Sequence, residues 1–188
     1  VVVAPSYDDS AIEVLKKKKD IRLLVIEGLD NIAERNKEYD LRKVVGGLLI
    51  QDRDLKNITE ADLKVVTKKA PSKEDIVDML FGWKVVKHVK SNAIVIVKDG
   101  ITLGVGAGQM NRVGSVKIAA EQAGEKARGS ILASDAMFPK ADAIDAAAKA
   151  GIKAIIQTGG SIKDNEVIEA ADKMGIIMVF TGIRHFKH

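Results

Sequence analysis

The apolar residues of the chain fall into short continuous runs separated by longer stretches of mixed apolar and polar residues. The short runs, several of them rich in Val and Ile, predict strands. They lie at residues 1–4, 21–26, 44–50, 93–97, 101–105, 131–133, 152–157 and 176–180. The mixed stretches predict helices at about residues 8–18, 59–62, 72–87, 113–128, 139–150 and 165–174. Residues 27–40 are charged and have no clear period, so we expect a loop or irregular connection there.

Capping signals support several of these helices. Thr59 and Ser72 each stand three residues before an aspartate, which is the spacing of a capping box. Asn111 is placed to cap the helix that follows it, and Pro139 fits a first helical turn. In the helix that starts near residue 72, apolar residues recur at steps of three and four, which predicts a core-facing stripe. That stripe consists of Ile76, Leu80, Trp83 and Val86 or Lys87.

The order of the elements predicts the sheet. Asp99-Gly100 lies between two apolar runs, which is a strong signal for a hairpin of antiparallel strands. From residue 131 to residue 180 strands and helices alternate, with Gly151 and Gly175 at positions that suit helix C-caps. This β-α-β-α-β run predicts a parallel sheet covered by helices. The sequence therefore predicts an α/β fold with a mixed sheet.

Composition and charge narrow the class of protein. Hydrophobic residues make up 46% of the chain, and the net charge is only +4, so we expect an ordinary globular protein with no nucleic-acid partner. The chain has no cysteine, which excludes thiolate chemistry, and no apolar run near the roughly 20 residues of a membrane span. We therefore predict a cytoplasmic location. The chain starts at Val1 in a predicted strand, which we interpret as the start of a fragment.

A glycine-rich stretch, GVGAGQMNR at residues 104–112, connects a predicted strand to a predicted helix. It is not a dinucleotide fingerprint, because Gln109 stands where the third glycine is needed, and it is not a P-loop. Two interpretations stay open: its amides bind an anion or polar ligand, or its glycines allow a bulge or a close backbone crossing. In either case, the hairpin should bring the stretch beside Asn92.

Two further polar segments have two interpretations each, and the ending of the chain has one. Residues 134–139 follow a buried strand, where α/β sheets bind ligands, but Asp135 could instead cap a helix. The Thr158–Ser161 loop has the same two interpretations, and turn chemistry is favoured. The ending, residues 184–188, has the composition of a frayed tail. No histidine has metal-ligand spacing, so we predict no metal.

Three ordered segments together carry a resemblance. They are FGWKVVKHVKSNAIVIVKDGITLGVGAGQMNRVGSVKIA, ASDAMFPKADAIDAAAKAGIKAIIQTGGSIKD and GIRHFKH. The chain resembles the C-terminal part of the AICAR transformylase domain of the bifunctional purine biosynthesis enzyme. The resemblance implies that residues 1–71 are the end of the preceding half of that domain or a linking segment. It implies residues 72–188 as a cytidine-deaminase-like subdomain with three α/β/α layers.

The resemblance also implies an activity and a site. The implied reaction is formyl transfer from 10-formyltetrahydrofolate to AICAR in purine biosynthesis, in a homodimer. Asn92 is implied as the catalytic residue that stabilises an oxyanion. The implied substrate-binding residues are Arg112, Gln109, Met137, Phe138, Asp142, Arg184, Phe186 and His188, and the implied folate-binding residues are Pro139 and Gly108. On this basis the ending should be folded into the site, contrary to its composition.

One departure from the family pattern concerns the acid and base. The family's Lys-His pair stands in a Lys-His-x-x-Pro-small-Gly context that this sequence does not contain, and Lys87-His88 lies in a different context. We therefore expect the missing half of the domain, together with an IMP cyclohydrolase domain, in the full protein. The alternatives are a binding module for a purine ribotide or folate, a fragment that is inactive alone, and a generic nucleotide-binding α/β domain.

Overall fold

The structure is a computed structural model, and it describes residues 1–30 and 39–187. The chain divides into two compact units, Val1–Leu55 and Lys56–His188. Most of the predicted loop at residues 27–40, and the predicted site residue His188, lie outside the described residues. Every helix within the described residues is too short or too polar to cross a membrane.

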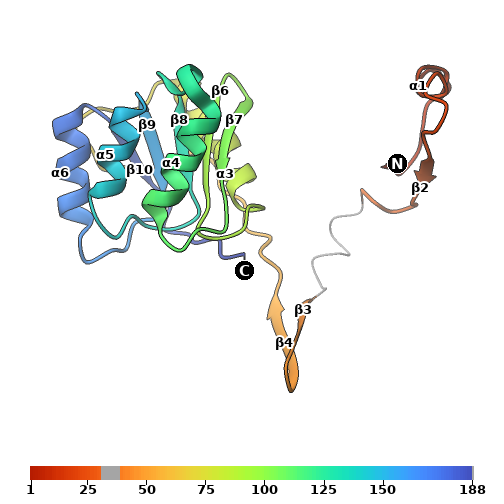
Figure 1. The fold of residues 1–188 in the computed structure, drawn as a ribbon, viewed down its shortest axis with the longest axis horizontal. Coiled ribbons are helices and arrows are strands. Elements are labelled where there is room, and N and C mark those ends of the chain that lie inside the picture. Colours follow the sequence, from red (N-terminus) through yellow and green to blue (C-terminus); the bar gives the residue numbers. More distant parts are fainter. Residues whose placement is uncertain (31–38, 188) are drawn as a thin grey trace. The chain divides into compact units, whose positions relative to one another are not determined.

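The first unit begins with a β-α-β segment. Strands β1 (Val2–Ala4) and β2 (Leu23–Val25) pair in parallel, and helix α1 (Asp9–Leu15) connects them along the chain (Figure 1). All three elements lie where the sequence predicted two strands and a helix. None of the described residues in this unit is fully buried, so its elements form no core of their own.

A hairpin completes the first unit and corrects one prediction. Strands β3 (Tyr39–Val44) and β4 (Gly47–Asp52) pair antiparallel, with Val44 opposite Gly47. The single strand predicted at residues 44–50 is therefore wrong, because the chain reverses direction inside it. Gly46 adopts a φ of 82°, a conformation that residues with a side chain rarely adopt.

The second unit is built on a six-stranded mixed sheet of order β5-β10-β9-β8-β6-β7. Its strands are β5 (Lys64–Val65), β6 (Ile94–Lys98), β7 (Ile101–Gly106), β8 (Ile131–Ser134), β9 (Ala154–Gln157) and β10 (Ile177–Phe180). Strands β8, β9 and β10 are parallel, as predicted, whereas β5, β6 and β7 pair antiparallel with their neighbours. The helices are α3 (Lys73–Val86), α4 (Arg112–Ala123), α5 (Asp142–Lys149) and α6 (Asp164–Met174), with 3₁₀ turns η1 (Glu60–Asp62) and η2 (Gly124–Ala127).

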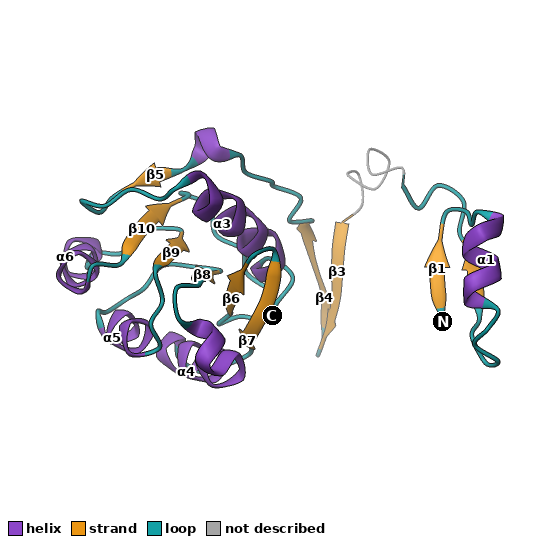
Figure 2. Cartoon of the chain, turned by 90° about the horizontal axis from the view of Figure 1, so that it is seen from above, coloured by secondary structure: helices purple, strands orange, loops and turns teal. Residues whose placement is uncertain are grey.

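Helices cover both faces of this sheet and confirm the predicted three-layer α/β class. Helix α3 packs on one face, and α4, α5 and α6 lie on the other (Figure 2). Successive residues of a strand point to opposite faces. Accordingly, Ile94 and Ile96 of β6 pack in the cluster that contains α4, whereas Val95 and Val97 pack in the cluster that contains α3. The core is therefore two apolar layers separated by the sheet.

The predicted hairpin and caps are confirmed. Asp99 and Gly100 form the β6–β7 turn with φ values of 53° and 69°, and the Asp78 carboxylate accepts a hydrogen bond from each of their amides at 2.8 Å. The Asn111 side chain accepts a hydrogen bond from the Gly114 amide at 2.8 Å and caps α4. Short-range sequence signals therefore locate these turns correctly.

Two helix predictions need correction. The fully buried apolar face of α3 centres on Met79, Trp83 and Val86, while Ile76 and Leu80 of the predicted stripe are half-buried. Trp83 and Val86 of the predicted stripe are therefore confirmed, and Leu80 packs against the same core cluster. Helix α5 begins at Asp142, so Pro139 precedes the helix and does not lie in its first turn.

The compact unit begins before residue 72. Strand β5 pairs with the edge strand β10, and the Val66 amide donates to the Met178 carbonyl at 3.0 Å. These contacts place residues 56–71 with the second unit. The boundary between residues 71 and 72 stays a prediction about the two halves of the family's transformylase domain.

Candidate functional site at the carboxyl edge of the sheet

One edge of the sheet gathers most of the predicted site residues. Strands β8, β9 and β10 end at this edge, and because β6 is antiparallel to β8, β6 begins there, with Ile94 opposite Ser134. The segment before β6, the loop before α4 and the loops after β8, β9 and β10 therefore lie along this edge. In α/β proteins this is the usual place for a ligand site.

Arg112 is the centre of a buried hydrogen-bond network. Arg112 is only 6% exposed, and its guanidinium donates to the Ser134 hydroxyl at 2.9 Å, to the Ala93 carbonyl and to the Asp135 carboxylate. Its other terminal nitrogen donates to Asn92 Oδ1 at 3.0 Å. Arg112 therefore connects α4, β8 and the start of β6, and its positive charge is neutralised inside the protein by Asp135.

Asn92 lies beside the glycine-rich stretch, as predicted from the hairpin. Its side-chain nitrogen donates to the Gln109 carbonyl at 2.9 Å, and its own carbonyl accepts from the Ser115 hydroxyl at 2.8 Å. The side chain is half-buried, and the Arg112 contact fixes which end of its amide is the donor. This residue can therefore present an oriented N–H to a polar group at the edge.

The glycines of the stretch permit a close crossing of β7 and α4. A Cβ on Gly106 would lie 2.6 Å from the Ser115 carbonyl carbon, and a Cβ on Gly104 would lie 2.9 Å from that of Ala119. Neither position has room for a side chain. Gly108 turns the chain with a φ of 63°, and its amide donates to the Lys90 carbonyl at 2.8 Å. Of the two interpretations, the close crossing therefore accounts for Gly104 and Gly106.

Asp135 and Ser91 hold the C-terminal segment at this edge. The Asp135 carboxylate, fully buried, accepts from the Ser91 hydroxyl at 2.6 Å, and its backbone carbonyl accepts from the His185 amide at 2.9 Å. Lys187 exchanges two hydrogen bonds with Ser91: the Ser91 amide donates to its carbonyl at 2.8 Å, and its amide donates to the Ser91 hydroxyl at 3.1 Å.

Residues 182–187 therefore cross the sheet edge as a strap. The Gly182 amide donates to the Thr158 carbonyl after β9, at 2.9 Å, before the strap reaches Asp135 after β8 and Ser91 before β6. His185 is buried, and its ring packs against Trp83 of α3 with 4.9 Å between the ring centroids. The composition suggested a frayed tail, and the structure shows residues 184–187 folded in instead.

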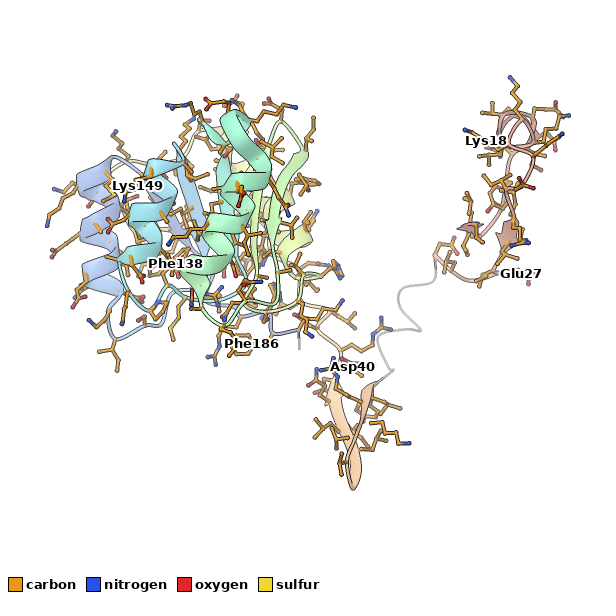
Figure 3. All side chains as sticks on the ribbon, viewed as in Figure 1. Lys18, Glu27, Asp40, Phe138, Lys149 and Phe186 are labelled. Carbon is orange, nitrogen blue, oxygen red and sulfur yellow. The ribbon has the colours of Figure 1, made fainter. Side chains whose placement is uncertain are left out.

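A small cavity of about 290 Å³ opens beside the strap. It is lined by Met137, Thr158, Gly159, Gly160, Gly182 and Arg184. The Arg184 guanidinium lies over the ring of Phe186, 5.2 Å from its centroid, and Figure 3 shows Phe186 at the edge of the unit. Three of the predicted substrate-binding residues thus gather at or next to one cavity.

The loop at residues 158–161 follows the turn interpretation that its sequence favoured. Asp164 at the start of α6 accepts hydrogen bonds from the amides of Gly160 at 2.7 Å and Ser161 at 3.1 Å. These amides are therefore already satisfied by a carboxylate of the protein. Thr158 is buried, and only part of this loop is left to line the cavity.

Three other predicted residues lie apart from the network. Phe138 is fully buried in the core cluster that contains α4 and α5 and has no surface to offer a ligand (Figure 3). Pro139 is exposed. Asp142 is exposed on the first turn of α5, accepts from the Ala143 amide, and lines a different cavity, about 670 Å³ between α4 and α5.

The structure also shows where Lys87-His88 lies and whether metal-ligating side chains gather anywhere in the described residues. Lys87 ends α3, where its side-chain nitrogen donates to the Lys56 carbonyl at 3.0 Å, and His88 is exposed on the following turn. Within residues 1–30 and 39–187, no three metal-ligating side chains gather in a group.

Sequence reasoning missed the partners of Asp135. The residue was marked by its position after a buried strand, but the alternative of a helix cap is wrong, because α5 starts later and its N-cap residue is Ala141. Ser91 carried no signal of its own, because its role depends on β6 pairing with β8 and on the return of the C-terminal segment. Both are tertiary contacts.

Fold and site together describe a mixed α/β unit with a polar network and a small cavity at the carboxyl edge of its sheet. The family model for the AICARFT/IMPCHase bienzyme matches residues 1–122. The chain belongs to this family.

Curated relatives are similar over the whole chain. The chain is 56% identical over 188 residues to the bifunctional purine biosynthesis protein PurH of Anoxybacillus flavithermus. The proteins of the same name from Thermoanaerobacter sp. and Bacillus subtilis are both 57% identical, over 189 and 188 residues. All of this chain is covered in each case, and it spans 36% of the length of each relative.

Solved structures show a weaker likeness. Acinetobacter baumannii RibD, form 1, is similar with a TM-score of 0.44 and 20% identity, covering 58% of this chain and 35% of that chain. Form 2 of the same protein gives a TM-score of 0.38 and 19% identity, covering 52% and 31%. A likeness of this size says nothing about function.

Proposed function

We propose that the chain is the C-terminal part of an AICAR formyltransferase, which transfers a formyl group from 10-formyltetrahydrofolate to AICAR in purine biosynthesis. One observation carries the proposal. Asn92, Arg112, Asp135 and the strap come from separate parts of the chain, yet they share one hydrogen-bond network at the carboxyl edge. Family membership and the names of the relatives support the choice of reaction.

The reaction needs an oxyanion site, a base and an acid. The exocyclic amine of AICAR attacks the formyl carbon, the carbonyl electrons move to oxygen, and the bond from that carbon to the folate nitrogen then breaks. The amine proton passes to a base, and the departing nitrogen takes a proton from an acid. Asn92 provides an oriented amide for the oxyanion. We expect the base and the acid from the part of the longer protein that this chain does not span.

Substrate binding is assigned to the cavity beside the strap. Arg184 brings a positive charge to the cavity, and we assign it to the ribotide phosphate, while the Phe186 ring next to it supplies an aromatic face. Arg112 is buried and already paired, so we assign it the role of orienting Asn92. The folate contacts of Pro139 and Gly108, the homodimer, the cyclohydrolase domain and the cytoplasmic location all stay predictions.

Formyl transfer tests the proposal directly. The chain is mixed with the part of Bacillus subtilis PurH to which it does not align, and tetrahydrofolate formation is followed with AICAR and 10-formyltetrahydrofolate. We expect turnover only in the mixture, and a loss of about 100-fold or more with Asn92→Ala. Asn165→Ala, an exposed asparagine on α6, is the matched control and should keep full activity. Full turnover by the chain alone would show that the acid and base are present in it.

Calorimetry gives an independent test of the cavity. AICAR should bind the chain, and Arg184→Ala should weaken binding at least tenfold. Arg128→Ala is the control, since this exposed arginine pairs with Glu125 at the end of η2. The absence of AICAR binding by the folded chain, together with no turnover in the mixture, would refute the proposed function.

A further inference from the structure

Asp135 connects the part of the candidate site around Asn92 with the strap at residues 182–187. One oxygen of its carboxylate accepts from Arg112, which in turn donates to Asn92 Oδ1 at 3.0 Å. The other oxygen accepts from the Ser91 hydroxyl at 2.6 Å, and Ser91 is bonded twice to Lys187 of the strap. The carboxylate is fully buried, so each of its oxygens has a defined partner.

The backbone of Asp135 makes the same connection a second time. Its amide donates to the Ala93 carbonyl at 3.2 Å, next to Asn92, and its carbonyl accepts from the His185 amide at 2.9 Å. A single residue at the end of β8 is thus bonded to the start of β6, to α4 and to the strap.

We propose that Asp135 is a positioning residue that sets the orientation of the Asn92 amide through Arg112 and fixes the strap through Ser91. The proposal rests on the proposed function, in which Asn92 meets the reacting carbon and Arg184 meets the substrate. Arg112 can only donate, and its buried positive charge needs an anion, so the position favours an aspartate. An asparagine of the same shape carries no charge, and with its single oxygen toward Arg112 it turns an N–H toward Ser91, so the Ser91 hydroxyl loses the group that accepts from it.

Substitutions of Ser91 separate the two connections of Asp135, one through Arg112 to Asn92 and the other through Ser91 to the strap. Ser91→Ala removes the hydroxyl that accepts from the Lys187 amide and donates to Asp135, but keeps the backbone bond from the Ser91 amide to the Lys187 carbonyl. It leaves the bond between Asp135 and Arg112 intact, whereas Asp135→Asn weakens the contacts of Asp135 to both Arg112 and Ser91. Ser91→Thr keeps a hydroxyl and should rescue the strap. Asp78→Asn is the matched control, since the Asp78 carboxylate also accepts two hydrogen bonds, but at the β6–β7 turn.

Hydrogen exchange of the folded chain, without substrate, tests the strap. In Ser91→Ala and Asp135→Asn we expect the amides of His185 and Lys187 to exchange at least tenfold faster, with the amide of Ile156 in β9 unchanged. Trp83 is the single tryptophan and packs against His185, so its emission should change in the same variants. Ser91→Thr and Asp78→Asn should match the wild type.

Kinetics in the mixture with the part of Bacillus subtilis PurH to which the chain does not align tests the effect of Asp135 on Asn92. We expect Ser91→Ala to raise KM for AICAR at least tenfold with little change in kcat, and Asp135→Asn to lower kcat at least tenfold as well. Exchange of His185 and Lys187 no faster than in Asp78→Asn would refute the proposal, as would faster exchange spread evenly over the β-strands. If Asp135→Asn does not fold, Ser91→Ala decides the matter by the same exchange measurement. The exchange measurements need no turnover, so they stay valid if formyl transfer fails.

Discussion

Gly106→Ala tests the close crossing that shapes the glycine-rich stretch. The added Cβ would lie 2.6 Å from the Ser115 carbonyl carbon and 2.8 Å from its Cα, and closer still to its carbonyl oxygen. Carbon atoms in contact are normally about 3.5–4.0 Å apart. Strand and helix would therefore have to separate by about 1 Å, and the clashing atoms are backbone atoms that cannot rotate away.

The cost can be bounded from what holds α4 in place. Ser115 donates its hydroxyl to the Asn92 carbonyl, and Arg112 anchors the start of the same helix, so a shift of α4 also strains the buried network. Overpacking usually costs about 1–3 kcal/mol. With backbone on both sides, we expect about 3 kcal/mol or more, which corresponds to a fall in Tm of about 10 °C for a domain of this size.

Urea unfolding followed by Trp83 fluorescence measures this cost, because Trp83 is 1% exposed in the native core. Gly114→Ala is the control: it lies on the same helix, and the nearest atom to its added Cβ is the Asn111 side-chain oxygen at 3.1 Å. The control should change the unfolding free energy by less than about 1 kcal/mol. An equally small effect of Gly106→Ala would show that the crossing is not as tight as the structure has it.

Three further predictions concern the second unit. Ser72→Ala removes the hydroxyl that accepts from the Asp75 amide at the start of α3, and should lower the unfolding free energy by about 1 kcal/mol in the same urea assay. Burial raises the pKa of Asp75, but hydrogen bonds from Lys153 and Ser72 outweigh it and hold the pKa below its ordinary value. Asp75 therefore stabilises the fold above about pH 4 and loses that contribution as the pH falls below it, and Lys153→Met should flatten this acid dependence in melts at several pH values. Finally, both core clusters lie within residues 58–183, so the shortened chain of residues 56–188 should melt cooperatively within a few degrees of the full chain.

Local chemistry explains which elements could be predicted. The Asp99-Gly100 turn and the Asn111 cap depend only on residues within a few positions of each other, and the sequence predicts both correctly. Gly151 and Gly175 have φ values of 79° and 71°, as expected for residues that end a helix. Patterns of this range need no knowledge of the tertiary fold.

The wrong predictions concern residues whose structure depends on tertiary packing or on exposure to solvent. An apolar run such as residues 44–50 is compatible with one buried strand or with the turn and second strand of an exposed hairpin, and only Gly46-Gly47 marks the reversal. Phe138 follows a buried strand and precedes a helix, which fits a pocket wall as well as a core position. The structure places it in the core because α4 and α5 close over it.

The candidate site likewise contains contacts that the sequence could predict and contacts that it could not. Asn92 and the glycine-rich stretch flank the two strands of one hairpin, in which Ile94 lies opposite Gly106, so the sequence alone places them together. Asp135 reaches them only because β6 also pairs with β8, and Lys187 only because the strap returns across the edge. Neither pairing has a local signature.

Arg112 shows what this difference means for function. The resemblance implies Arg112, at the end of the glycine-rich stretch, as a substrate-binding residue. Its acceptors Ala93, Ser134 and Asp135 are 19, 22 and 23 residues away in the chain, so no local pattern could reveal that the charge is neutralised internally. The cation that lines the cavity is Arg184, and the strap that carries it is held by Asp135. The carboxylate that pairs with Arg112 is therefore the same group that, in the proposed function, holds the strap on which Arg184 meets the substrate.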